Sequence, residues 1–481
     1  MTILEKTGAQ AFDKWEYKIF LLVSSIVAAF VISKMGMLPG MLILGLPVVI
    51  FVLNILIKKP LSAVWGSIFI GFFTAGLARY VSAPFGLLMD IILIAAWIGL
   101  IFKNKQTNIP WKNLKDSGYI VSGIWFLLVL LELGNPEMVS GMAWFYAMRA
   151  VGFYQMLVLG LVYLFVNDKS FLDKFLKVIS WLSVAGTIWG LKQMIIGTDA
   201  AEEYWLFVEG YADTHVLVGV LRVFSFYSDA GQFGASQAQL ALMAGIIAIG
   251  PGKWSTRLFY VFIALITFVG FGISGTRGAL AVPAGGAIAY LVVSRNFKLL
   301  IAGILAMGIS FYFLKYTYAL QGVEQVRRMR TALNVDDPSL QVRLQNQIKF
   351  GNYLASRPFG GGIGSAGYWG YRFSPHTFLA NTATDSYYVK IWAETGIIGI
   401  SLHLAMFGFF LGKGGVIIWH LRDPILRQKI IALYSGVVGI LLSSYGNQVF
   451  SQMPTGIIMY ISIPLIFISP KFDNPPSKNK D

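Results

Sequence analysis

Three arginines have a residue type and a setting that indicate chemistry. Arg222 precedes a long apolar run, Arg277 separates two such runs, and Arg343 begins a polar segment that ends in glycines. A guanidinium beside hydrocarbon is costly without an anionic partner, and it binds phosphate oxygens through paired hydrogen bonds. We therefore expect these arginines to bind a phosphate-bearing ligand. In the alternative interpretation, Arg222 and Arg277 are interfacial residues or ion-pair partners of Asp213 or Asp229.

Four further polar residues could bind substrate or exchange protons. Asp385 lies where the chain re-enters an apolar run, and His376 lies nine residues before it. Either is a candidate general base, although an ion pair with an arginine explains Asp385 equally well. Lys192 and Gln193, near the end of another apolar run, add hydrogen-bond donors. The sequence thus predicts a polar site that contains cations and an acid-base group.

Thiol, metal and nucleotide sites are not supported. The chain has no cysteine, and its four histidines lack the spacing of metal ligands. The segment Gly362-Ile-Gly-Ser-Ala-Gly367 matches a dinucleotide-binding fingerprint, but that fingerprint requires a preceding strand and a following helix, which we do not expect here. We interpret the segment as a tight glycine turn, and we expect no metal and no cofactor.

Membrane-spanning helices must position these residues. Of the 481 residues, 56% are hydrophobic and 13% are charged, against roughly a quarter charged in soluble proteins, so a soluble globule is excluded. A helix needs about 20 apolar residues to cross the hydrocarbon core. Apolar runs predict an all-α polytopic membrane protein with about 14 transmembrane helices, at residues 19–33, 37–57, 61–80, 84–102, 118–133, 150–166, 175–196, 232–249, 258–273, 279–293, 299–314, 387–411, 430–443 and 455–468. Asp90, inside one of these runs, has no partner that the sequence identifies.

The charges between these runs predict the topology. Lysine and arginine occupy every second connection, as in cytoplasmic loops. The net charge of +15 therefore needs no nucleic-acid partner, and both termini should face the cytoplasm. We expect helices 1–11 within residues 1–314, a large outer loop at 315–384, helices 12–14 within 385–470 and a cytoplasmic tail at 471–481. The helical spacing of Val323–Leu354 predicts one or two surface helices, and we interpret Arg327–Arg330 as their solvated basic face.

The order of these residues resembles the O-antigen ligase and Wzy-type polysaccharide polymerase superfamily of bacterial inner membranes. The resemblance covers about Lys192 to Gly399. It rests on an arginine-led segment before a span, on a Ser-x-x-Arg-Gly segment, on an arginine-led helix that runs into proline and glycines, and on a polar pair with a tyrosine before Glu-x-Gly-Ile-x-Gly. These parts are matched by Arg222–Phe226, Ser274–Gly278, Arg343 with Pro358–Gly364, and Asp385, Ser386 and Tyr388 with Glu394–Gly399.

The resemblance implies a GT-C-like membrane glycosyltransferase at the periplasmic face of the inner membrane. The implied donor is a polyprenyl-diphosphate-linked glycan, the acceptor is a glycan or a lipid-linked glycan, and neither metal nor nucleotide sugar takes part. The implied catalytic residues are Arg277 and either Asp385 or His376, and the implied substrate-binding residues are Arg222, Arg343, Lys192, Gln193 and Tyr388.

Two alternatives to this function stay open. Ligases of the superfamily often have His-Asn where this chain has Asp385-Ser386, which favours a polymerase of O-antigen or exopolysaccharide over an O-antigen ligase. From another class, a membrane transporter could use the same arginines to draw in an anionic or lipid-linked substrate. Transporters tend to have repeated halves, and we find no internal repeat in the sequence.

Overall fold

The computed structural model describes residues 49–473, except 104–107, 218, 296, 320, 323 and 332–337, and a few isolated residues before position 49. The predicted run at 19–33 and much of the run at 37–57 therefore lie outside the described residues. Described residues 64–93 and 109–473 belong to one compact unit, and residues 49–63, 94–103 and 108 belong to another. The sites discussed below lie in the first of these, which we call the larger unit.

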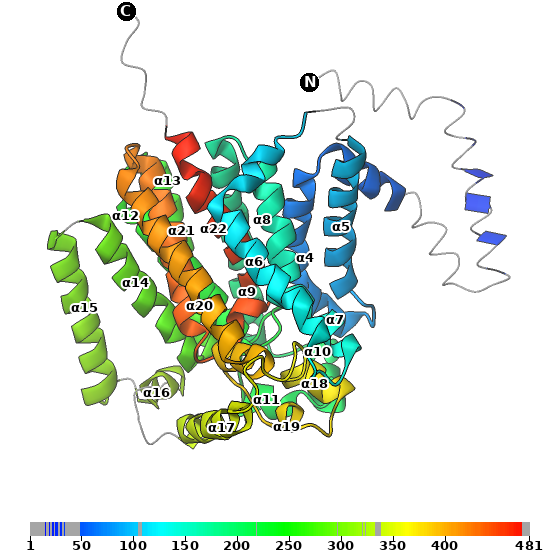
Figure 1. Ribbon diagram of the computed structural model, residues 1–481. Helices are drawn as coiled ribbons and strands as arrows, with labels where there is room; N and C mark the ends of the chain where they lie inside the picture. Colours follow the sequence, from blue (N-terminus) through cyan, green and yellow to red (C-terminus); the bar gives the residue numbers. More distant parts are fainter. Residues whose placement is uncertain are drawn as a thin grey trace, which may run out of the picture. The chain divides into compact units, whose positions relative to one another are not determined.

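Long helices form most of the described chain (Figure 1). The first half contains α4 (Leu61–Tyr80), α5 (Gly86–Lys103), η1 (Trp111–Lys115), α6 (Ser117–Leu131), η2 (Glu132–Gly134), α7 (Gly141–Met148), the π-helix η3 (Arg149–Phe153), α8 (Tyr154–Phe165), α9 (Lys169–Ile195), α10 (Ala200–Glu203), the π-helix η4 (Tyr204–Val208), α11 (Ala212–His215) and α12 (Ala230–Ile249). Two short antiparallel strands, β1 (Val216–Leu217) and β2 (Val220–Leu221), lie between α11 and α12.

The second half of the described chain also consists mainly of helices. It contains α13 (Trp254–Ser274), η5 (Arg277–Leu280), α14 (Ala281–Ser294), α15 (Phe297–Tyr316), α16 (Glu324–Thr331), α17 (Pro338–Leu354), α18 (Gly367–Phe373), α19 (Phe378–Asn381), α20 (Tyr387–His420), α21 (Pro424–Ser443), η6 (Val449–Ser451), α22 (Thr455–Ile468) and η7 (Ser469–Phe472). The range Val323–Leu354, for which we expected one or two helices, contains α16 and α17.

Membrane-spanning helices dominate the described part of the chain. Among the described residues, nine helical segments are long and apolar enough to cross a membrane, from Leu61–Tyr80 to Thr455–Phe472. Every predicted run from residue 61 onward falls on a helix, so the prediction of an all-α polytopic membrane protein is confirmed, while the count of about 14 stays a prediction. Several helices are longer than their apolar runs: α20 continues to His420 and α13 begins at Trp254. Interfacial residues can extend a helix because its backbone groups bond internally while polar ends reach water.

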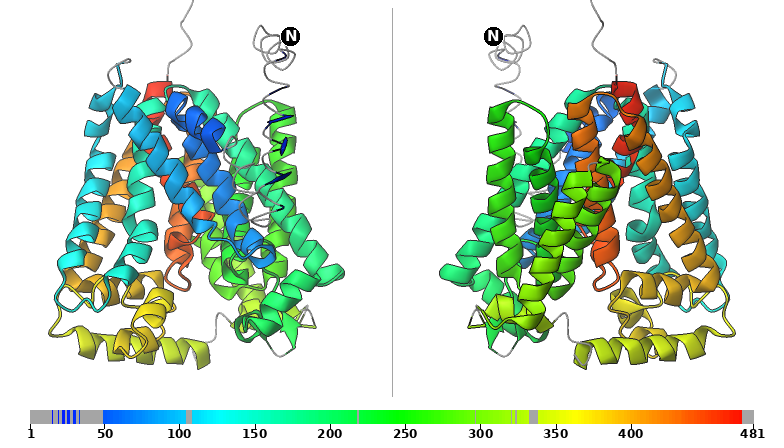
Figure 2. Two further views of the ribbon diagram at one scale, coloured as in Figure 1. Left: turned by 90° about the vertical axis from the view of Figure 1, so that its right-hand side faces the viewer. Right: turned by 90° about the vertical axis from the view of Figure 1, so that its left-hand side faces the viewer.

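Short helices gather at one end of the larger unit. Figure 1 shows α10, α11 and α16–α19 at this end, whereas η7 lies at the other. In the turned views of Figure 2, α17 lies across the end of the long helices. The predicted outer loop and the C-terminal end of the fold are thus on opposite sides, as the predicted topology requires. We call the end with α16–α19 the outer end.

The glycine segment docks against a break in α20. Gly396 interrupts this helix with φ 62° and ψ −164°, and a Cβ there would overlap the carbonyl oxygen of Pro358. The amides of Gly361 and Gly362 donate to the carbonyls of Ala393 and Glu394, at 3.0 and 2.8 Å. The segment follows α17 and precedes α18, so it is a glycine turn with no preceding strand, as interpreted from the sequence.

Candidate functional site

Two of the predicted arginines lie within electrostatic reach of each other at the outer end, together with one that we had not assigned to the site. Arg222 follows β2, Arg277 begins η5, and Arg328 lies on α16, which packs against η5 and α13. Burial lowers the pKa of Arg222; Asp229 opposes this shift, and the charges of Arg328 and Arg277 add to it. We call Arg222, Arg277 and Arg328, together with Asp229, the arginine cluster. Its guanidinium groups suit an anionic ligand.

The segment from Arg222 to Asp229 holds two members of this cluster. At one end, the backbone amide of Arg222 donates to the carbonyl of His215 at 2.8 Å, and its Nη1 donates to the carbonyl of Thr214 at 3.2 Å. At the other end, Asp229 caps α12 by accepting from the amide of Gln232 at 2.9 Å, which is a favourable place for a carboxylate. The charge of Asp229 also acts on Arg222, so the alternative interpretation of Arg222 as a partner of Asp229 stays open.

Arg343 and Asp385 form a second polar group. The Nε of Arg343 lies 3.7 Å from Oδ2 of Asp385, and the two side chains are 36% and 41% exposed. Asp385 has φ 48°, a left-handed conformation that is uncommon outside glycine and often marks a functional site. The predicted ion pair of Asp385 with an arginine is thus present, and both groups remain accessible to a substrate.

The connection between α21 and η6 holds Asp385 from both sides. The amide of Tyr387 donates to the carbonyl of Ser444 at 3.0 Å, and Nε2 of Gln448 donates to Oγ1 of Thr384 at 2.8 Å. On α17, Asn346 donates to the carbonyl of Ala383 at 3.2 Å. These bonds fix the backbone around Asp385 relative to the helix that carries Arg343.

The same connection contacts the arginine cluster. Ser443 Oγ donates to the carbonyl of Gly278, next to Arg277, at 2.9 Å. A Cβ on Gly278 would overlap Nδ2 of Asn447, and the Asn447 side chain also lies within 4 Å of a Cβ placed on Gly231 at the start of α12. Nδ2 of Asn447 is buried without a hydrogen-bond partner. Residues 443–448 therefore join the arginine cluster to the Arg343–Asp385 pair, and Asn447 is a candidate ligand that the sequence analysis did not identify.

The other predicted site residues lie in different settings. His376 is exposed in the connection between α18 and α19. Tyr388 is half-buried and donates its hydroxyl to the carbonyl of Leu441 at 2.7 Å. Lys192 pairs with Asp199 and Glu202 at 3.0 and 3.1 Å. The roles of His376, Tyr388 and Lys192 in substrate binding stay predictions.

Gln193 is turned inward. Its side chain is 2% exposed, and its amide bonds to the backbone of Phe224 and Ser225 and to the carboxylate of Glu202. His215 is also buried, with edge-to-face contacts to Trp205 and Phe224, and burial lowers its pKa. Both residues support the segment that carries Arg222.

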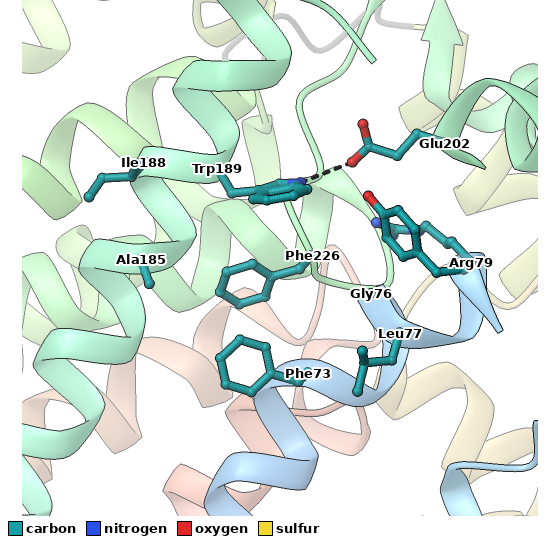
Figure 3. A pocket seen from close by; sticks show the side chains of 10 residues that line it. Phe73, Gly76, Leu77, Arg79, Ala185, Ile188, Trp189, Glu202 and Phe226 are labelled. Atoms are coloured by element: carbon teal, nitrogen blue, oxygen red, sulfur yellow. Dashed lines mark hydrogen bonds between the residues drawn. The ribbon is translucent and has the colours of Figure 1, made fainter. Parts of the chain in front are cut away.

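An apolar pocket lies between α4 and α9 (Figure 3). Its volume is about 410 Å³, and its apolar walls include Phe73, Leu77 and Phe226. At its polar end, Trp189 Nε1 donates to Glu202 Oε1 at 3.0 Å. Phe226 belongs to the same segment as Arg222 and Asp229, so this segment contributes residues both to the pocket and to the arginine cluster.

Two half-buried arginines at the outer end were missed by the sequence analysis. Arg79, near the end of α4, donates to the carbonyls of Ser225 and Tyr227. Arg149 pairs with Asp90 at 2.6 Å, and Tyr154 also donates to Asp90 at 2.7 Å, so Asp90 has the partner that the sequence did not identify. The sequence did contain a signal for these two arginines. Both lie on the side predicted to be outer, whereas lysine and arginine are usually concentrated in cytoplasmic loops.

Potential metal ligands do not gather in the described part of the chain: no group of three or more His, Asp or Glu side chains there could hold an ion. The polar groups that do gather are the arginines of the cluster, the Arg343–Asp385 ion pair and the side-chain amide of Asn447. This arrangement suits recognition of an anion by arginine together with proton transfer by a carboxylate.

Part of the chain is similar to known proteins. Residues 262–404, which include Arg277, Arg343 and Asp385, match the family model described as O-antigen ligase. The chain is 30% identical over 195 residues to an O-antigen polymerase of Salmonella muenchen; the alignment covers 39% of this chain and 45% of that relative. The chain therefore spans less than half the length of the curated relative it matches. The resemblance to the O-antigen ligase and polymerase superfamily is thereby confirmed.

Proposed function

We propose that this protein is a glycosyltransferase that transfers a polyprenyl-diphosphate-linked glycan to an acceptor sugar at the periplasmic face of a bacterial inner membrane. The observation that carries the proposal is the arginine cluster, in which the charges of Arg277, Arg328 and Asp229 act on Arg222. Guanidinium groups that lie close together can bind a diphosphate, because each forms paired hydrogen bonds with phosphate oxygens. The O-antigen ligase match over residues 262–404 supports the same class of reaction.

The transfer step needs charge stabilisation and a base. The acceptor hydroxyl oxygen bonds to the anomeric carbon of the donor, while the bond from that carbon to the diphosphate oxygen breaks. The hydroxyl proton goes to a base, and the diphosphate leaves with additional negative charge. Arg277 and Arg222 stabilise this charge, since guanidinium groups placed where charge develops lower the barrier.

Asp385 is the proposed base. It lies at the start of α20 in a fixed left-handed turn, and its carboxylate is 41% exposed. A carboxylate can take the proton if it lies within hydrogen-bond reach of the hydroxyl, and Arg343 beside it orients the carboxylate or binds substrate. His376, exposed in the connection before α19, is the alternative base.

The substrate's isoprenoid chain would lie between spans. The apolar pocket between α4 and α9 shares Phe226 with the segment that carries Arg222, so a lipid in this pocket would have its charged end near the arginine cluster. Lys192 stands near the polar end of the pocket through its pairs with Asp199 and Glu202. A polymerase remains favoured over a ligase, because Asp385-Ser386 replaces His-Asn.

Reconstitution tests this function. The purified protein in lipid nanodiscs is given the lipid-linked glycan of the bacterium that makes it, and the products are separated by chain length. We expect lengthened glycan together with free polyprenyl diphosphate, and loss of both in Arg222→Ala. Transport of the intact donor across a liposome membrane, without a new glycosidic bond, would favour the transporter instead.

A further inference from the structure

We propose that Arg79 and Gln193 are positioning residues for the donor site. They hold the turn at Ser225 in one conformation and thereby set the places of Arg222 and Asp229. The inference rests on the proposed function, and it extends the site to α4 and α9, outside the residues that the family model matches.

The turn at Ser225 requires support. Ser225 is fully buried and has φ 54°, a left-handed conformation. Such a conformation costs free energy in a residue with a Cβ, and it persists where the surroundings determine it. Ser225 lies three residues after Arg222 and four before Asp229. A change at this turn therefore affects Arg222 and Asp229, the two members of the arginine cluster on this segment.

Gln193 supports the turn with every polar atom of its side chain. Its Oε1 accepts from the amides of Ser225 and Phe224, at 2.7 and 3.3 Å. Its Nε2 donates to the carbonyl of Ser225 at 3.2 Å and to Glu202 at 2.7 Å. Because the side chain is 2% exposed, losing these bonds would leave buried polar groups unpaired. A residue predicted to bind substrate directly thus acts on the backbone beside the site.

Arg79 supports the turn from the other side. Its two terminal nitrogens donate to the carbonyls of Ser225, at 2.7 Å, and of Tyr227. Its guanidinium carbon lies 4.3 Å from the ring centroids of both Trp205 and Phe224. A planar fork between two aromatic rings is a geometry that lysine cannot reproduce. Arg79 therefore fixes the backbone on both sides of Phe226, which lines the apolar pocket shown in Figure 3.

The side chain of Ser225 itself adds a further hydrogen bond to the turn. Ser225 Oγ donates to the carbonyl of Gly186 on α9 at 2.7 Å. With these anchors on α4 and α9, the Arg222–Asp229 segment has little freedom to move. Rigid placement matters for transfer, because displacement of a binding group by about 1 Å can cost about a hundredfold in rate.

Kinetics separate positioning from a purely structural role. We expect Arg79→Lys to raise the KM for the lipid-linked donor by about tenfold or more, with the KM for the acceptor unchanged. A variant that merely folds less well would instead lower kcat in proportion to its active fraction, at an unchanged KM. Arg149→Lys is the matched control, because Arg149 is also half-buried and pairs with Asp90 elsewhere in the fold; it should leave both constants within about twofold of wild type.

A labelling assay detects a change in the conformation of the turn without measuring enzymatic activity. The chain has no cysteine, so Ser228→Cys introduces a single thiol next to Asp229. We expect Arg79→Lys or Gln193→Met, each combined with Ser228→Cys, to change the rate of labelling by a water-soluble thiol reagent by several-fold. Arg149→Lys should not change it. Gln193→Met fills a similar volume without the hydrogen bonds, and it serves as the second test if Arg79→Lys folds poorly.

The outcomes distinguish this inference from the proposed function. Unchanged labelling and an unchanged donor KM in both Arg79→Lys and Gln193→Met would overturn the positioning role. Changed labelling in a protein that transfers no glycan would leave the role in shaping the segment intact while removing the proposed function. A lower kcat at constant KM in Arg79→Lys, with unchanged labelling, would also overturn the inference. Arg79 would then contribute to folding alone.

Discussion

Replacing Asp385 by asparagine separates its chemical role from its structural one. Two unit charges 3.7 Å apart, the separation of Arg343 Nε and Asp385 Oδ2, interact by about 1 kcal/mol in water-like surroundings. Both side chains are more than a third exposed, so their contribution to folding lies at about 0–1 kcal/mol. Asp385→Asn keeps the shape of the side chain and its ability to accept hydrogen bonds. We therefore expect its melting temperature to stay close to that of wild type.

The rate should respond much more strongly than the stability. A positioned general base contributes about 10²–10⁴-fold, so Asp385→Asn should lower kcat by about a hundredfold or more while donor binding persists. The assay gives purified enzyme a lipid-linked donor and acceptor and follows glycan length, with donor binding measured separately. His376→Ala is the comparison variant, and it should retain most of the activity because His376 is exposed in the connection between α18 and α19. Full activity in Asp385→Asn, together with loss in His376→Ala, would refute the reasoning and assign the base to His376.

Further predictions concern the cluster, the metal requirement, the topology and the broken helix. Arg277→Lys should lose about a hundredfold in transfer rate, because an ammonium cannot form the paired bonds of guanidinium; near wild-type kinetics would contradict this. Transfer should continue after treatment with a metal chelator, and loss of activity restored by a divalent cation would show a metal requirement. In cells, a membrane-impermeant thiol reagent should label Tyr371→Cys from the periplasm but Trp254→Cys only after the inner membrane is opened; the reverse pattern would invert the topology. Gly396→Ala should destabilise the protein by about 1–3 kcal/mol from the backbone conformation alone, whereas Gly408→Ala, with open space around it, should melt like wild type.

The helices could be predicted because the hydrophobic pattern that indicates a helix depends on residues that are close in the sequence. Every predicted run from residue 61 onward coincides with a helix, whereas the single site that the resemblance implied for Arg222, Arg277 and Arg343 stays a prediction. The ends were less predictable: α20 continues to His420, nine residues past its predicted limit. An apolar run measures the hydrocarbon core, whereas a helix can continue into the interface.

Long-range partners were the part that sequence could not supply. Asp90 meets Arg149 across 59 positions, and Gln193 meets Ser225 across 32, so neither pairing has a local signature. Arg328 belongs to a run with the spacing of a solvated face, yet the packing of α16 on η5 brings it near Arg222. Asn447 lies in a short connection whose importance follows from its contact with Gly278.

Binding of the leaving group tests the central claim most directly. Polyprenyl diphosphate and polyprenyl monophosphate share the same lipid chain, so their difference in affinity isolates the second phosphate. The affinities are measured on the purified protein in nanodiscs. Wild type should bind polyprenyl diphosphate at least about tenfold more tightly than polyprenyl monophosphate. Arg222→Ala and Arg277→Ala should lose that preference, while Arg149→Lys should keep it. Equal affinity of the wild-type protein for the two lipids, or an unchanged preference in both alanine variants, would contradict the assignment of the arginine cluster as the diphosphate site.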